Sequence, residues 1–194
     1  MTNKKLLLLL ITTIYIIFNL SAETITEEFV NKASGKTIIY KGEDYRGEGT
    51  FFLKNEAKLI TIVTTEIRYG PMVNWFGNDI AEIFIPHGNP FNSSFLFNTR
   101  TLKLSDMLNN LIAVFPEQDI VVYTDFENFY FARINSQEIL QKIHINGIEG
   151  SYMALRHYFN ILIQNDVIKI GVKYEPYTYK DLETYKYYDF KKEF

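Results

Sequence analysis

The side chains best suited to chemistry are three histidines, since the 194-residue chain has no cysteine. Imidazole binds transition metals and carries protons near neutral pH. However, His87, His144 and His157 have no close histidine neighbour in the sequence, and none belongs to a metal-binding motif such as HExxH. A metal site would need Asp or Glu ligands that no spacing indicates. We therefore expect no metal ion and no cofactor.

A nucleophilic triad could in principle combine Ser93 or Ser94 with His87 and Asp79. The surrounding sequence, FIPHGNPFNSS, lacks the GxSxG turn that presents a serine nucleophile in many hydrolases. Serine beside asparagine, among Pro and Gly, is the usual composition of a turn. This stretch therefore predicts a change of chain direction rather than an assembled triad.

Paired carboxylates offer a second route to catalysis, in the sequence TDFEN. Asp125 and Glu127 flank Phe126, and residues two apart on a strand share a face, so the two could act as acid and base. The same stretch also fits a hairpin turn that Asp125 caps through its side chain. We favour the turn. A hydrolase that uses carboxylates or His87 on an antiparallel β scaffold remains the alternative function.

Two loops, residues 69–79 and 86–94, carry the candidate binding residues. They combine the single tryptophan of the chain with phenylalanines, amides and a histidine, a composition typical of contact surfaces. If both loops lie close together at the surface, they form a patch for a partner. The stronger interpretation buries the large rings in the core and leaves Gly, Asn and Pro to turn the chain. The candidates are Trp75, Phe76, His87, Asn89, Phe91 and Asn92.

Short β-branched and aromatic runs must position these loops. Each run is bounded by Gly, Pro, Asn or Asp, as strands are, and the links are too short for parallel crossovers. The predicted strands cover residues 36–41, 49–54, 59–69, 79–85, 94–98, 119–124 and 128–134.

Apolar residues at helical spacing predict helices over residues 24–34 and 105–115. Residues 136–143 fit a short helix or a strand, and 151–165 fit either a helix or part of a hairpin that turns at 164–166. We predict a mainly β (α+β) domain on a largely antiparallel sheet or meander, with two to four short helices. An all-β sandwich, barrel or propeller-like meander is the alternative.

Residues 115–143 run through a strand, a turn that bears an Asp, an aromatic strand, a second turn and a further short segment. In this order they resemble a single blade repeat of a β-propeller. The resemblance implies meander topology for this part of the chain, and we recognise no family beyond it.

The first 22 residues have the order of a secretory signal peptide. Lys4 and Lys5 precede the apolar run Leu6–Leu20, which is shorter than the about 20 residues of a membrane span, and small residues follow. We expect cleavage after Ala22 and one secreted β-rich domain over residues 23–194. A tyrosine-rich arm at about 174–194 packs on this domain or adds a strand to a partner.

Net charge and amino-acid composition limit the classes of partner that we expect. The formal net charge is −3, whereas nucleic acid and anionic membranes require a concentrated basic face. The absence of cysteine suits a bacterial periplasm better than an extracellular fluid that favours disulfides. We therefore expect a secreted or periplasmic, non-catalytic domain that binds a protein or an envelope component, with no nucleic acid and no stable membrane insertion after cleavage.

Overall fold

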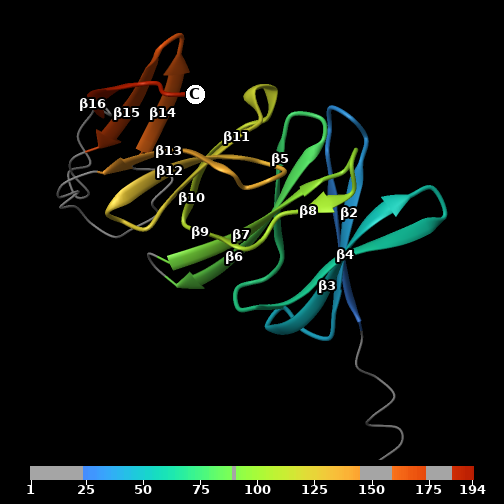
Figure 1. Ribbon diagram of the computed structural model, residues 1–194. Coiled ribbons are helices and arrows are strands. Elements are labelled where there is room, and N and C mark those ends of the chain that lie inside the picture. The colour runs from blue at the N-terminus through green and yellow to red at the C-terminus, as the bar shows by residue number, and fades with distance from the viewer. Residues whose placement is uncertain (1–23, 89–90, 145–158, 174–184) are drawn as a thin grey trace, which may run out of the picture.

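The computed structural model describes residues 24–88, 91–144, 159–173 and 185–194, and within these ranges the chain is mostly β-strand, joined by turns and loops (Figure 1). The strands form four antiparallel sheets that follow one another in chain order. We number them sheets 1 to 4 in that order. Sheets 1 and 3 are four-stranded meanders, because each strand pairs with the next one along the chain.

Sheet 1 contains β1 (Ile25–Val30), β2 (Thr37–Gly42), β3 (Gly47–Asn55) and β4 (Lys58–Ile67). Sheet 2 contains β5 (Met72–Phe76), β6 (Ile80–Gly88), β7 (Phe91–Asn98) and two short strands that both pair with β7, namely β8 (Lys103–Leu104) and β9 (Leu108–Asn109).

Sheet 3 contains β10 (Leu111–Phe115), β11 (Ile120–Thr124), β12 (Asn128–Arg133) and β13 (Ile139–His144), with the 3-10 turn η1 (Pro116–Gln118) between β10 and β11. Sheet 4 contains β14 (Phe159–Gln164), β15 (Val167–Lys173) and β16 (Tyr185–Lys191).

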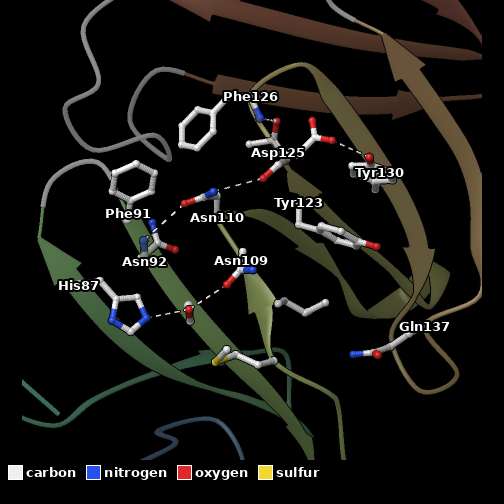
Figure 2. Close-up of a pocket in the computed structure, with 14 residues that line it drawn as sticks. His87, Phe91, Asn92, Asn109, Asn110, Tyr123, Asp125, Phe126, Tyr130 and Gln137 are labelled. Atoms are coloured by element: carbon white, nitrogen blue, oxygen red, sulfur yellow. Dashed lines mark hydrogen bonds between the residues drawn. The ribbon is translucent and has the colours of Figure 1, made fainter. Parts of the chain in front are cut away.

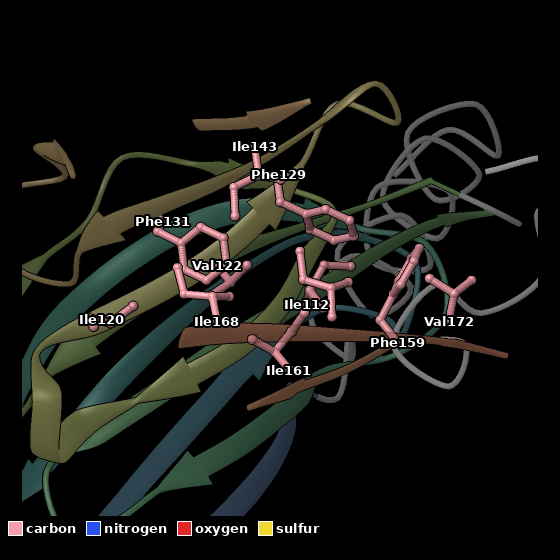
Figure 3. Close-up of a cluster of buried hydrophobic side chains, with 11 residues drawn as sticks. Ile112, Ile120, Val122, Phe129, Phe131, Ile143, Phe159, Ile161, Ile168 and Val172 are labelled. Atoms are coloured by element: carbon pink, nitrogen blue, oxygen red, sulfur yellow. The ribbon is translucent and has the colours of Figure 1, made fainter. Parts of the chain in front are cut away.

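Three separate hydrophobic clusters hold neighbouring sheets together. The first joins sheets 1 and 2, the second joins sheets 2 and 3, and the third joins sheets 3 and 4 (Figure 3). Side chains alternate between the two faces of a strand. In β12, Phe129 and Phe131 therefore pack against sheet 4, whereas Ala132 packs toward sheet 2. Sheets 2 and 3 are covered on both faces, which explains why β6, β11 and β12 are buried along most of their length.

The four sheets form an open series. Four-stranded antiparallel sheets stacked in chain order are also how the blades of β-propellers are built. In the described part of the chain, however, no closed barrel forms, and none of the three clusters joins sheet 1 to sheet 4. The all-β alternative is therefore confirmed at the level of a strand-rich, antiparallel fold.

The prediction of two to four helices is wrong, since the described residues contain only the short η1 turn besides strands and loops. Within residues 24–34, Ile25 and Phe29 lie on one face of β1, because residues four apart share a face in a strand as well as in a helix. Within residues 105–115, Asn110 takes a left-handed backbone (φ 49°) and divides the segment between β9 and β10.

Two ambiguous segments resolve into strands. Residues 139–144 form β13, and residues 159–173 form the β14–β15 hairpin, in which Asn165 occupies the turn with φ 48°. Residues 185–191 of the tyrosine-rich arm pair with β15 as the third strand of sheet 4. Residues 151–158 and 174–184 lie outside the described ranges.

The expected signal peptide, residues 1–22, also lies outside the described ranges. In the part of the chain that the structure covers, no helix has the length and apolar character that a membrane crossing requires. The same ranges hold no group of three His, Asp or Glu side chains placed to bind a metal ion.

Candidate functional site

A pocket of about 870 Å³ opens between sheets 2 and 3 (Figure 2). Its size falls in the range of small-molecule sites, about 300–1,000 Å³. The described lining residues come from the β6–β7 hairpin, β9 and the residues beside it, the β11–β12 hairpin, and the turn after β12. They are His87, Phe91, Asn92, Ser93, Met107, Leu108, Asn109, Asn110, Tyr123, Thr124, Asp125, Phe126, Tyr130 and Gln137.

The lining residues reach both ends of β12. Phe126 lines the pocket from the turn before this strand, and Gln137 lines it from the turn after the strand. Six residues in extended conformation span roughly 20 Å. The amide of Gln137 is held in place because its Nε2 donates a hydrogen bond to the backbone oxygen of Asp106 at 3.2 Å.

A chain of hydrogen bonds starts from His87, at the irregular pairing between β6 and β7. His87 Nε2 lies 2.8 Å from Ser93 Oγ, and the Ser93 hydroxyl donates to Asn109 Oδ1 at 3.0 Å. Both contacts are drawn in Figure 2. Asn109 is exposed, so its amide nitrogen is available to a ligand while its oxygen accepts from Ser93.

Two further amides, those of Asn92 and Asn110, are buried in the lining. Asn110 donates from Nδ2 to the backbone oxygen of Thr124 at 3.3 Å, and its Oδ1 accepts from the backbone N–H of Asn92 at 3.4 Å. The Asn92 side chain is only 9% exposed, and its Oδ1 has no hydrogen-bond partner among the described residues. A buried acceptor without a partner is rare and destabilises the free protein.

Asp125 organises the β11–β12 hairpin. Its Oδ1 accepts from the backbone N–H groups of Glu127 at 3.0 Å and Asn128 at 2.7 Å, and its Oδ2 accepts from the Tyr130 hydroxyl at 2.6 Å. Burial raises the pKa of Asp125, but the bonds from Tyr130, Asn128 and the backbone outweigh it and lower this pKa to about 2. The bond to Asp125 raises the pKa of Tyr130. The predicted side-chain cap is confirmed, and a carboxylate with so low a pKa is a poor general base.

Four aromatic rings form two pairs in the pocket. Phe91 meets Phe126 edge to face, with ring centroids 5.7 Å apart, and Tyr123 stacks on Tyr130 at 5.1 Å. Phe91 is 57% exposed. Phe126 has a φ of 76°, which is unusual for an aromatic residue and costs about 1–3 kcal/mol of backbone strain.

The pocket carries little charge. Among its described lining residues, Asp125 is the one carboxylate, and there is no lysine or arginine. The remaining polar groups are amides, hydroxyls and the imidazole of His87. Such a surface offers hydrogen bonds in both directions but no strong attraction for an anion.

The structure brings together three of the six candidate binding residues. His87, Phe91 and Asn92 line the pocket, and Asn89 lies outside the described ranges. Trp75 lies elsewhere, because it pairs with Ala81 of β6. Ala81 is six residues before His87, which corresponds to about 20 Å along the strand.

Trp75 and Phe76 contribute to the hydrophobic clusters instead. Half-buried Trp75 packs against the cluster between sheets 1 and 2, and its Nε1 has no partner among the described residues. Phe76 packs against the cluster between sheets 2 and 3. The two loops that carry the candidates therefore do not form one patch.

The triad is not assembled. Asp79 lies in the turn before β6, where it pairs with Lys36 and Arg100, and the hydrogen bond from Lys36 helps to hold its pKa below the usual value. Ser93 contacts His87, but it is only 1% exposed and its hydroxyl proton points to Asn109. The Ser93 hydroxyl is therefore engaged with Asn109 and is not held by a base that an acidic side chain among the described residues orients.

Sequence reasoning missed most of the remaining lining residues. Met107, Asn109 and Asn110 fell in a segment predicted to be a helix, and Tyr123 and Tyr130 were read only as strand residues. The Asn109–Asn110 pair was the available signal, because asparagine favours turns and left-handed backbone over helix interiors.

No family model matches the chain, and no curated protein matches its sequence. Among solved structures, it is similar to Kluyveromyces lactis Hsv2, with 8% sequence identity and a TM-score of 0.33. The alignment covers 78% of this chain and 43% of that chain. At this TM-score the likeness assigns neither a fold nor a function.

Proposed function

We propose that the protein is a non-catalytic, secreted or periplasmic binding module, and that the pocket between sheets 2 and 3 holds a component of the cell envelope. The supporting observation is the pairing of an exposed aromatic ring, Phe91, with the unpartnered buried amide oxygen of Asn92. The unpartnered amide oxygen is unfavourable in the free protein. The exposed Phe91 and Met107 side chains give the same lining an accessible apolar area. A ligand that covers this area and donates a hydrogen bond to Asn92 would use both features.

Strain in the lining supports the same site. Seven non-glycine residues in the described part of the chain have a positive φ, and three of them, Asn110, Phe126 and Gln137, line the pocket. Strained backbone tends to concentrate where the position of a side chain matters for binding. Phe126 is the clearest case, because a glycine or an asparagine would adopt this conformation more easily.

A hydrolase remains the alternative, and the contact between His87 and Ser93 is the observation that favours it. Burial of Ser93 and the low pKa of Asp125 both weigh against it. Assays of ester and amide turnover separate the two functions. A binding module shows no turnover in the wild type, whereas a serine hydrolase shows turnover that Ser93→Ala abolishes.

Co-sedimentation with insoluble envelope material from the source organism tests the proposal. Phe91→Ala removes the exposed ring and should reduce the bound fraction at least tenfold, with little effect on folding. Leu59→Ala is the matched control, because Leu59 is also a large exposed apolar residue (41%) and lies on β4, in sheet 1. Equal binding of the wild type and both variants would refute a role for the pocket.

A further inference from the structure

We infer that the ligand of this pocket is a neutral carbohydrate chain. The inference rests on the proposed binding function and specifies the chemical class of the ligand. Four properties of the lining carry it: its charge, the combination of aromatic rings and amides, its length, and the absence of a free strand edge on its sheet-3 side.

The charge of the lining disfavours an anionic ligand. Phosphate, sulfate and acidic sugars are usually held by arginine or lysine, and the described lining has neither. Asp125 adds one negative charge, and its pKa of about 2 keeps it ionised at every pH above about 4. Lys142 does not line the pocket, and its ammonium lies over the Tyr130 ring, 5.3 Å from the ring centroid. The described lining itself therefore offers an anion no cationic partner, and a neutral ligand suits it better.

The lining combines aromatic rings with amide groups. In Figure 2 the side chain of Asn110 lies between the Phe91–Phe126 pair and the Tyr123–Tyr130 pair, and the side chain of Asn109 lies below it, toward His87. A sugar ring has a C–H face that packs on an aromatic ring and an edge of hydroxyl groups. Each hydroxyl both donates and accepts, as do an amide and an imidazole with its two ring nitrogens. The two surfaces therefore match in polarity.

A cation cage is the nearest competitor, because it too combines aromatic rings with a carboxylate. Here the aromatic side chains form two separate pairs and do not enclose one common space. Tyr130 lies between Tyr123 and Lys142 in the strand register, so a stacked phenol ring and an ammonium already occupy its two sides. Neither a cation nor a sugar ring stacks on Tyr130, and the exposed ring of Phe91 makes that contact with a sugar. The Asp125 carboxylate is engaged by Tyr130 and by the hairpin backbone.

An extended peptide would usually bind by adding a strand to an open sheet edge. The strands that form the sheet-3 side of the pocket, β11 and β12, lie in the interior of their sheet and offer side chains rather than free backbone groups. A pocket that extends along β12 suits a chain of several sugar units better than one ring. The geometry therefore favours recognition by side chains along an oligosaccharide.

Envelope polysaccharide that has been digested with protease and stripped of lipid provides the first test. The full wild-type protein should still bind this material, and Phe91→Ala and Asn109→Ala should each weaken binding at least tenfold, while Leu59→Ala does not. Loss of binding after protease digestion alone would identify a protein ligand, and loss after lipid extraction alone would identify a lipid. Either result overturns the inference.

Direct titration provides the second test, with cello-, chito- and malto-tetraoses and the matching disaccharides followed by NMR line broadening. At least one tetrasaccharide should bind at least tenfold more tightly than its disaccharide and should compete with the polysaccharide. If untreated envelope binds through Phe91 but neither digested polysaccharide nor any tetrasaccharide binds, the carbohydrate inference fails and the binding function stands. If the protein binds none of these materials, untreated envelope included, the binding function and the carbohydrate inference both fail.

Discussion

The Asp125 cap makes stability depend on pH in a predictable way. The folded pKa of this carboxyl is about 2, against an ordinary value of 3.8. Because the folded pKa is the lower one, the stabilisation is fully present above pH 4 and is lost as the pH falls from about 4 through 2. Without solvent screening, the difference between the two pKa values would correspond to about 2.5 kcal/mol. Asp125 is exposed, and screening reduces this to about 1 kcal/mol.

Asp125→Asn isolates this contribution, since the amide keeps the shape of the side chain and removes its charge. We expect the free energy of unfolding to fall by about 1 kcal/mol at pH 7, because charge-assisted hydrogen bonds are replaced by neutral ones. Most of the difference from wild type should disappear by pH 2.5, where the native carboxyl also begins to lose its charge.

Urea denaturation followed by circular dichroism, at a series of pH values between 7 and 2.5, measures both quantities. Glu127→Gln is the matched control, since it removes a charge from the same turn and its side chain is exposed. It should change stability little at any pH. A destabilisation by Asp125→Asn that stays constant with pH, or the same pH profile from Glu127→Gln, would refute the reasoning.

Four further measurements test other parts of the structure. Trp75→Ala should lower the free energy of unfolding by about 3 kcal/mol, because the ring packs on the cluster between sheets 1 and 2; a loss below about 1 kcal/mol would place the ring at the surface. Gly49→Ala should cost about 1–3 kcal/mol, because a Cβ would lie 2.1 Å from the buried Tyr40 ring; the double variant with Tyr40→Leu should recover part of this loss, and strictly additive losses would contradict the contact. Intact mass of the exported protein should begin at Glu23, whereas a membrane-bound chain that retains residues 1–22 would contradict cleavage. EDTA should leave the melting temperature unchanged, and a fall of more than a few degrees would reveal a metal site.

The amino-acid sequence by itself determined the local β-structure. Runs such as DIVVYT and NFYFARI predicted strands, and β11 and β12 occupy those positions, because β-branched and aromatic side chains favour extended backbone wherever neighbours cover them. The Asp125 turn was equally local, since its hydrogen bonds reach no further than Tyr130. His87, Phe91 and Asn92 stay together in the pocket because they belong to one hairpin.

Only the tertiary structure decided which side chains face a neighbouring sheet and which residues line the pocket. Ile25 and Phe29 satisfy helical and strand spacing alike, and pairing with β2 selected the strand. Leu108 and Leu111 are three residues apart, a spacing that fits a helix and not one strand. Both enter the cluster between sheets 2 and 3, because they belong to two strands that Asn110 separates. Phe91 and Phe126 meet only because sheets 2 and 3 pack face to face. Such contacts depend on how sheets stack, and the spacing of residues along one strand carries no information about the neighbouring sheet.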